Sequence, residues 1–198
     1  SERSPASGPP GTATGPVPAT GTVAGVLDLI ESEIRSYLPR PDRVAAACDA
    51  LRGQIVPSCD GPADRLAAPE IPAVLERLLP LPARRVGEAI EPVIGLLTEL
   101  AGRIGDPWPI VSALLASPAA AVQLRALDLI VSLAAGGRLA VTPDTLAIVA
   151  ARAGEDQGPL MSGPALDRLA SVVAACRVPG APPGPDPAVY LLAGLQPC

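Results

Sequence analysis

Hydrophobic residues recur along most of the chain at intervals of three and four positions, which is the spacing of one face of an α-helix. The first stripe begins after Thr22, a good N-cap residue, and the helical pattern stops at Pro39. Its apolar positions are Val23, Val26, Leu27, Ile30, Ile34, Tyr37 and Leu38. No segment alternates between apolar and polar residues for long enough to indicate a β-strand.

The same pattern predicts further helices that are separated by proline and glycine. A second helix is capped by Asp42 and stops at Pro57, with an apolar stripe at Val44, Ala47, Cys48, Leu51 and Ile55. A short helix ends at Pro80, and a longer one from Val86 to Leu100 is kinked at Pro92. Later candidates occupy 110–115, 118–135, 143–153, 164–176 and a last turn or two around 189–192. The chain is therefore predicted to be all-α, with eight or nine short helices.

Two dipeptides bound the helix at 118–135 most clearly. Ser117 followed by Pro118 is the arrangement of an N-cap residue and a first helical residue. Gly136-Gly137 is a pair that commonly ends a helix, because glycine adopts the left-handed backbone conformation without strain. We therefore expect one helix to fill the interval between the two dipeptides.

The first 21 residues differ from the rest of the chain. They contain one Glu and one Arg, and otherwise only Ser, Pro, Gly, Thr, Ala and Val. A segment of this composition buries too little apolar surface to offset the conformational entropy that it would lose on folding. We expect residues 1–21 to form a disordered tail and residues 22–198 to form a single all-α domain.

An internal repeat adds to this architecture. Residues 126–135 recur at 165–174, with Ala, Leu, Asp and Ser in equivalent places. Ala89-Ile90-Glu91, which lies 37 residues before Ala126, has the same order of Ala, apolar residue and acidic residue. Because a shorter predicted helix precedes each copy, the repeating unit is a helical hairpin of 37 to 39 residues.

The segment from Ile110 to Ala134 carries a resemblance to known proteins. A Leu-Leu helix is followed by a Ser-Pro break, and then by Val122, Ala126 and Leu127 in the order Val-x-x-x-Ala-Leu. This pattern resembles the HEAT and armadillo superfamily of α-solenoids, and the resemblance extends over about residues 71–175. It implies stacked hairpins that present an extended surface to a protein partner. The alternative architecture is a compact helical bundle built from duplicated hairpins.

The composition removes the most common catalytic groups. The chain has no His and no Lys, so it lacks the usual general base and metal ligand and the Schiff-base nucleophile. The densest acidic cluster is Asp28, Glu31 and Glu33. We expect Asp28, Glu31 and Arg35 to form a charged outer face, since they lie opposite the apolar stripe. The prediction is a protein without enzymatic activity or cofactor, and an enzyme that uses carboxylates alone ranks third among the functions.

Four cysteines fall into two local pairs: Cys48 with Cys59, and Cys176 with Cys198. We expect two disulfide bonds and hence an exported protein, either secreted or in the cell envelope. Each bond would stabilise one end of the helical array by about 3 kcal/mol. The alternative is four buried thiols in a cytoplasmic fragment of a larger protein. The wide spacing is not that of a zinc site, and the acidic loop at 154–158 lacks the alternating ligands of a calcium loop.

Four residues are candidate contacts for a partner. Arg77, Arg84 and Arg85 flank the turn at 80–82, where they either meet an acidic partner or are neutralised by nearby Glu76, Glu88 and Glu91. Trp108 lies between two prolines at the entrance of a helix. There it serves either as a binding anchor or as a staple that holds the turn against the core.

The charge distribution excludes two other classes of function. The net charge is −5 and the arginines are scattered, so the sequence has no basic footprint for nucleic acid. The uncharged run at 107–124 is short for a membrane span and contains three prolines. We therefore expect a non-catalytic protein-binding or scaffolding module. The alternative is a carrier of a lipid or another apolar ligand in a cavity between the helices.

Overall fold

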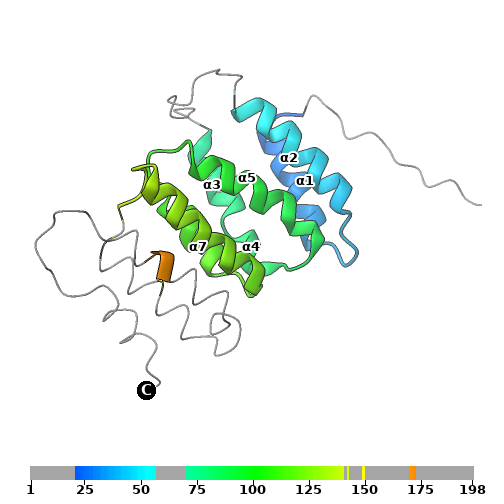
Figure 1. The fold of residues 1–198 in the computed structure, drawn as a ribbon. Helices are drawn as coiled ribbons and strands as arrows, with labels where there is room; N and C mark the ends of the chain where they lie inside the picture. Colours follow the sequence, from blue (N-terminus) through cyan, green and yellow to red (C-terminus); the bar gives the residue numbers. More distant parts are fainter. Residues whose placement is uncertain (1–20, 57–69, 141, 143–148, 150–169, 173–198) are drawn as a thin grey trace, which may run out of the picture.

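The fold was examined in a computed structural model, which describes residues 21–56, 70–140, 142, 149 and 170–172. Within these ranges the protein consists of seven α-helices and one 3₁₀-helix, with no β-strand, which confirms the predicted all-α class (Figure 1). The elements in chain order are α1 (Val23–Arg35), α2 (Pro41–Ile55), α3 (Ile71–Leu78), α4 (Leu81–Arg84), η1 (Glu88–Ile90), α5 (Glu91–Ala101), α6 (Trp108–Leu115) and α7 (Ala120–Ala135).

The helices form two layers. α2, α5 and α7 lie next to one another in one layer, and α1, α3 and α6 lie behind them (Figure 1). Adjacent helices pack as hairpins, since α1 contacts α2 and α6 contacts α7, while α5 contacts both α2 and α6. The apolar stripes of these helices meet in a continuous core whose largest fully buried side chains are Leu and Ile. Such a core needs no aromatic residue because many small aliphatic contacts fill it.

The start of α1 follows the prediction, but its end does not. Thr22 is the N-cap, and its Oγ1 accepts a hydrogen bond from the Gly25 N–H at 3.2 Å. The helix ends at Arg35, so the prediction that Tyr37 and Leu38 continue the buried stripe is wrong. These side chains are 92% and 76% exposed. The reason is Pro39, because its ring disfavours helical backbone at the preceding residue.

In α2 the predicted apolar stripe is confirmed at every position, since Val44, Ala47, Cys48, Leu51 and Ile55 are all buried. The predicted cap is displaced by two residues. Arg40 is the N-cap residue and Pro41 is the first helical residue, a position that tolerates a missing N–H. Asp42 lies in the first turn, where its negative charge is favourable near the positive end of the helix dipole.

α5 is shorter than the predicted helix from Val86 to Leu100. It begins at Glu91, and Pro92 lies in its first turn, so this proline opens the helix and does not kink it. Val86 lies before η1 and is 53% exposed, which corrects the prediction that it joins the apolar stripe. Gly87, with φ of +99°, redirects the chain between Val86 and η1.

The hairpin of α6 and α7 shows how the Ser-Pro break works. Ser117 is not the N-cap as predicted, because Ala119 takes that position and α7 begins at Ala120. Ser117 is buried, and its Oγ accepts a hydrogen bond from the Ala119 N–H at 3.3 Å. The hydroxyl therefore orders the turn just before the helix.

The end of α7 confirms the glycine prediction. Gly136 is the C-cap residue and Gly137 has φ of +66°. The Arg138 N–H donates to the Leu133 carbonyl at 2.8 Å, and the Gly137 N–H donates to the Ala134 carbonyl at 3.0 Å. These two hydrogen bonds define a Schellman motif, which satisfies carbonyls that the end of a helix leaves unpaired.

Several predictions fall outside the described residues and stay predictions. They concern residues 1–20 of the tail, the helices at 143–153 and 164–176, the last turn, and the second copy of the repeat at 165–174. The helices that the structure describes include none long and apolar enough to span a membrane.

Candidate functional site

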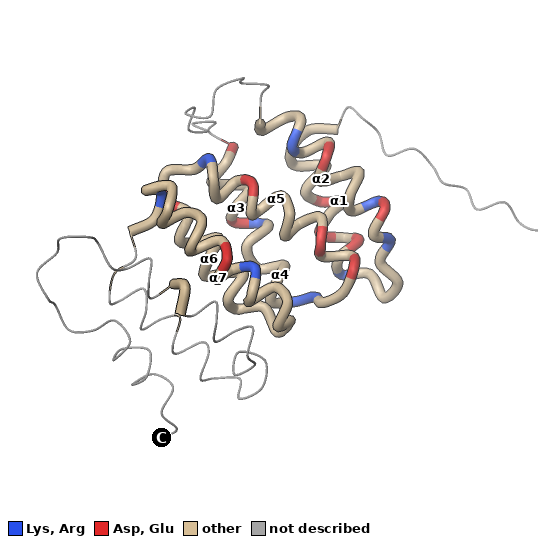
Figure 2. Tube along the Cα trace, viewed as in Figure 1, with Lys and Arg blue, Asp and Glu red and all other residues tan. Residues whose placement is uncertain are grey.

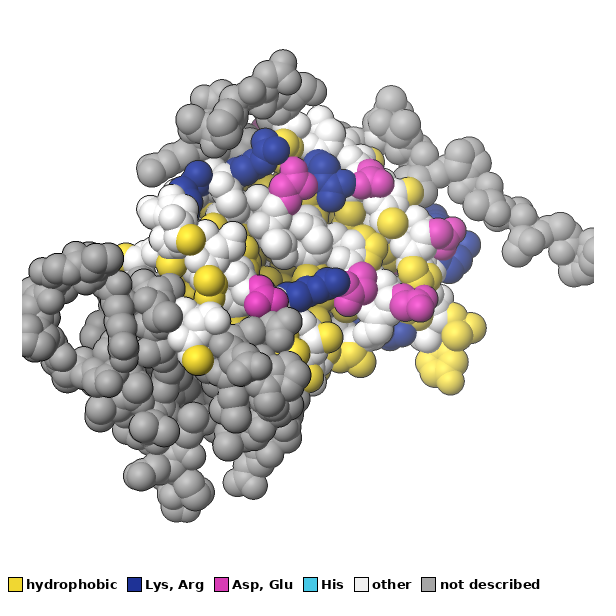
Figure 3. All heavy atoms as spheres, in the orientation of Figure 1, with side chains coloured by type: hydrophobic (Ala, Val, Ile, Leu, Met, Phe, Trp, Pro, Cys, Tyr) yellow, Lys and Arg dark blue, Asp and Glu magenta, His cyan; other side chains and the backbone are white. Residues whose placement is uncertain are grey.

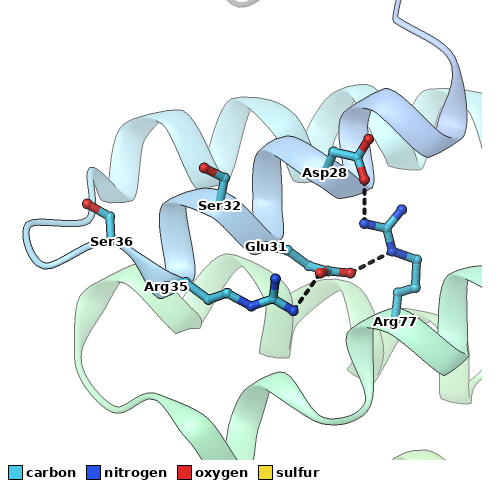
Figure 4. Close-up of a pocket in the computed structure, with 6 residues that line it drawn as sticks. All are labelled: Asp28, Glu31, Ser32, Arg35, Ser36 and Arg77. Atoms are coloured by element: carbon cyan, nitrogen blue, oxygen red, sulfur yellow. Dashed lines mark hydrogen bonds and ion pairs between the residues drawn. The ribbon is translucent and has the colours of Figure 1, made fainter.

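Arg77, a candidate partner contact, joins α3 to α1. Its Nη2 is 2.6 Å from Asp28 Oδ1, and its Nε is 2.5 Å from Glu31 Oε1 (Figure 4). The hydrogen bond to Glu31, followed by that to Asp28, raises the pKa of Arg77 above its usual range. Arg77 is therefore neutralised by acidic residues from α1, and not by the glutamates that lie near it in the sequence.

These contacts correct the prediction that Asp28, Glu31 and Arg35 form a free outer face. The Glu31 side chain is only 14% exposed and lies between two arginines, with Arg35 Nη2 at 2.8 Å and Arg77 on the other side. The three residues line an open groove of about 530 Å³ with Ser32, Ser36 and Arg77 (Figure 4). Its two acidic and two basic side chains pair with each other, so the groove offers a ligand no excess of either charge.

Glu33 forms a second ionic cluster, which holds the turn between α1 and α2. Its side chain is largely buried, and Oε1 accepts hydrogen bonds from Arg43 Nη1 at 2.7 Å and from Arg40 Nη2 at 3.2 Å. Oε2 accepts a third bond from the Arg40 backbone N–H at 3.3 Å. The buried carboxylate is thus fully engaged, as a buried charge must be. We call Glu33, Arg40 and Arg43 the turn clamp.

The turn clamp was not foreseen from the sequence. Arg40 and Arg43 follow Glu33 by seven and ten residues, and a helix boundary lies between them. Helical spacing rules do not apply across such a boundary, so the acidic residue was assigned to a surface cluster with Asp28 and Glu31. The only sequence signal is a proline-containing turn with an acid before it and arginines after it.

Arg85 holds the same turn from the opposite side. It follows α4, and its Nη1 donates a hydrogen bond to the Ser36 carbonyl oxygen at 3.2 Å. The segment that contains Arg85 and Val86 therefore lies within one arginine side chain of the turn. Arg84, the remaining predicted contact of this group, is exposed. The three arginines thus do not act as one patch, since Arg77 and Arg85 each make specific contacts within the fold.

The exposed hydrophobic side chains lie around this turn. Tyr37, Leu38 and Val86 are the large hydrophobic residues that stand exposed in the described part of the chain, and we call them the apolar tip. Hydrophobic side chains protrude at the end of the molecule where the turn between α1 and α2 lies (Figure 3). Because the turn clamp and Arg85 fix the backbone that carries Tyr37 and Leu38, the two side chains are presented from a defined position.

Trp108 lies apart from the apolar tip. It is the first residue of α6, it is half-buried, and it packs against the core. Its backbone N–H donates to Asp106 Oδ1 at 3.0 Å, which orders the entrance of the helix. This position suits the staple that the sequence predicts as one alternative, and a role in partner binding stays a prediction.

Ion pairs join the helices of the layer formed by α2, α5 and α7. Arg52 Nε of α2 is 2.7 Å from Glu99 of α5, and Arg125 of α7 pairs with Glu91 at the start of α5. Figure 2 shows the acidic and basic residues close to one another on this layer. Glu91 is therefore paired with α7 and does not neutralise Arg84 or Arg85.

Cys48 is a free, buried thiol on α2. Burial, opposed in part by the nearby Arg52 guanidinium, raises its pKa to about 12. A thiol of this kind stays protonated at neutral pH and is a poor nucleophile. The other cysteines, Cys59, Cys176 and Cys198, lie outside the described residues, so both expected disulfides stay predictions. The described residues contain no group of three or more side chains suited to hold a metal ion.

Comparison with known proteins gave no match to a family model, to a curated protein or to a solved structure. The class of protein is therefore defined by the fold alone, as an all-α protein with hairpin-like packing between adjacent helices. The similarity to HEAT and armadillo proteins stays an interpretation of the sequence.

Proposed function

We propose that this protein is a non-catalytic protein-binding module and that its partner binds the apolar tip. The observation that carries the proposal is the exposure of Tyr37 and Leu38 on a turn that is fixed from both sides. Large side chains at the centre of an interface supply most of the binding energy, and tyrosine and arginine are the types enriched there. A rigid turn also lowers the entropy that binding costs, because the contact residues are already in place.

The acidic residues of α1 support a non-catalytic role. Enzymes that work with carboxylates alone need two of them directed at one site. Here Asp28 and Glu31 are bound to Arg77, whereas Glu33 is enclosed in the turn clamp. The acidic cluster of the sequence is thus divided between two structural contacts, each of which satisfies its own charges.

The rest of the proposal concerns architecture and compartment. We infer stacked helical hairpins of the HEAT or armadillo kind, because the hairpin contacts of α1 with α2 and of α6 with α7 suit such stacking. We also infer an exported protein with disulfides 48–59 and 176–198. Intact mass after alkylation, with and without reduction, tests the compartment. Thiols that become accessible only after reduction support export, and four free thiols in the unfolded chain contradict it.

The binding role is tested with a double variant, Tyr37→Ser with Leu38→Ser. Both side chains are exposed, so the variant should fold like the parent, with the same helical circular dichroism and the same melting temperature within about 2 °C. A matched control, Ala46→Ser with Ala73→Ser, replaces two exposed apolar residues on other helices. A photo-crosslinking residue at position 37 should link a partner chain, which the double variant loses and the control retains. Loss of the partner by both variants, or by neither, contradicts the proposal.

A native mass spectrum of the purified protein separates this function from the carrier alternative. A carrier retains its ligand in the gas phase, so a bound lipid would support a cavity between the helices. The binding module is expected to give the mass of the chain alone. The two readouts are independent, because the crosslinking residue reports on the tip and the mass spectrum reports on the interior.

A further inference from the structure

We propose that the partner surface that meets the apolar tip is an acidic protein segment, in which carboxylates surround one or more hydrophobic side chains. This inference rests on the proposed function and specifies the chemistry of the partner. It follows from the charges that border Tyr37, Leu38 and Val86.

The two segments that carry the apolar tip have the opposite charge to the rest of the protein. Residues 33–43 and 84–88 contain five basic residues and three acidic ones. The remainder of the chain contains ten basic residues and seventeen acidic ones. The basic residues of the two segments are Arg35, Arg40, Arg43, Arg84 and Arg85. A local excess of positive charge on an acidic protein attracts and orients a negatively charged partner at this end of the molecule.

The arginines beside the tip retain the capacity to bind a carboxylate. Arg40 lies three residues from Tyr37 and is more than half exposed, although one nitrogen of its guanidinium contacts Glu33. Arg84 lies two residues from Val86 and is exposed. An arginine side chain has five N–H donors, so one hydrogen bond within the fold leaves others for a partner. The planar guanidinium matches a carboxylate with two parallel hydrogen bonds.

A protein partner fits these features better than a membrane surface does. Stable membrane attachment needs an amphipathic helix or two separate anchoring signals, whereas the apolar tip consists of three side chains. The whole chain carries a net charge of −5, which opposes its approach to an anionic bilayer. A tyrosine and arginines around one protruding turn are instead typical of an interface centre between proteins.

The test is a selection of random peptides, displayed on phage and closed into loops by a terminal disulfide, against the immobilised full chain. Peptides that bind should be enriched in Asp and Glu together with hydrophobic residues. Their affinity should fall about tenfold or more in the Tyr37→Ser, Leu38→Ser double variant. Arg84→Gln should weaken them by about two- to fivefold, and Arg125→Gln, on α7, should leave them unchanged. Binding should also weaken as salt rises from 50 to 300 mM, since the contacts are ionic.

The outcomes separate the two proposals. Neutral or basic peptides that need Tyr37 would overturn the acidic partner and leave the proposed function in place. Selected peptides that bind the double variant as well as the parent, or a selection that yields none, would overturn the proposed function. Vesicles of phosphatidylcholine with phosphatidylserine provide the last arm. Sedimentation of the chain with these vesicles that depends on Tyr37 would overturn the inference in favour of a membrane contact.

Discussion

The Glu33 carboxylate accepts a hydrogen bond from Arg43 Nη1 at 2.7 Å, across the turn that joins α1 to α2. Only 7% of Glu33 is exposed, so the charge of this acid is compensated inside the protein and not by water. The same carboxylate accepts the Arg40 backbone N–H, which sets the path of the chain just after Tyr37 and Leu38. An ionic contact, and not apolar packing, therefore fixes the turn that exposes the apolar tip.

Removal of the Glu33 carboxylate is expected to destabilise the protein. Glu33→Ala leaves two guanidinium groups and one backbone N–H without their acceptor, and we expect a loss of about 1–3 kcal/mol in the free energy of unfolding. Denaturation in urea measures the change. Glu76→Ala, at an exposed position of α3, is the control and should change stability by less than about 0.5 kcal/mol. Equal effects of the two substitutions would show that the turn clamp contributes nothing.

The contact between α1 and α3 depends on the shape of an arginine as well as on its charge. Arg77→Ala removes the pairs with Asp28 and Glu31 and should lower stability by about 1–2 kcal/mol. Arg77→Lys keeps the positive charge, but an ammonium group does not bind two carboxylates in the geometry of a guanidinium. We expect lysine to recover less than half of the loss in urea denaturation. Full recovery would mean that charge alone holds the two helices together.

The sequence predicts well those features that depend on neighbouring residues. The cap at Thr22, the buried stripe of α2 and the end of α7 at Gly136-Gly137 all follow from local rules. Tyr37 and Leu38 were misplaced because their spacing continues the apolar stripe, although Pro39 had already ended the helix. Periodicity alone does not detect where a helix stops.

The contacts of Arg77 and Glu33 were beyond prediction for a different reason. Arg77 lies 46 residues from Glu31 and 49 from Asp28, so these pairs form only when α3 packs against α1. One sequence does not show which of its 20 acidic residues meets a given arginine. The apolar tip depends on the same tertiary contacts, because its backbone is held by Glu33 and Arg85.

The buried thiol of Cys48 predicts a pH dependence in the reduced protein. The thiol ionises near pH 9 in the unfolded chain and near pH 12 in the folded protein, so above pH 9 the unfolded chain loses its proton first. Stability from this group is complete below pH 9 and falls by up to about 1.4 kcal/mol per pH unit between pH 9 and 12.

Urea denaturation at several pH values from 8 to 11 measures this effect. Cys48→Ala lacks the thiol, so the difference in unfolding free energy between it and the reduced parent should shrink as pH rises. In the oxidised protein a bond between Cys48 and Cys59 removes the same titration. A difference that stays constant with pH in the reduced protein would contradict the burial of an ionisable thiol.

Two glycines should respond in opposite directions to replacement by alanine. Gly137 ends α7 with φ of +66°, a conformation that strains any residue with a Cβ atom, so Gly137→Ala should lower stability by about 1 kcal/mol. Gly95 lies inside α5, and a Cβ atom added there meets no atom within 4 Å. Gly95→Ala should therefore raise stability by about 0.5–1 kcal/mol, because alanine loses less backbone entropy in a helix. Thermal or urea unfolding of both variants decides the matter, and a change of the same sign in both would mean that one of the two helix positions is assigned wrongly.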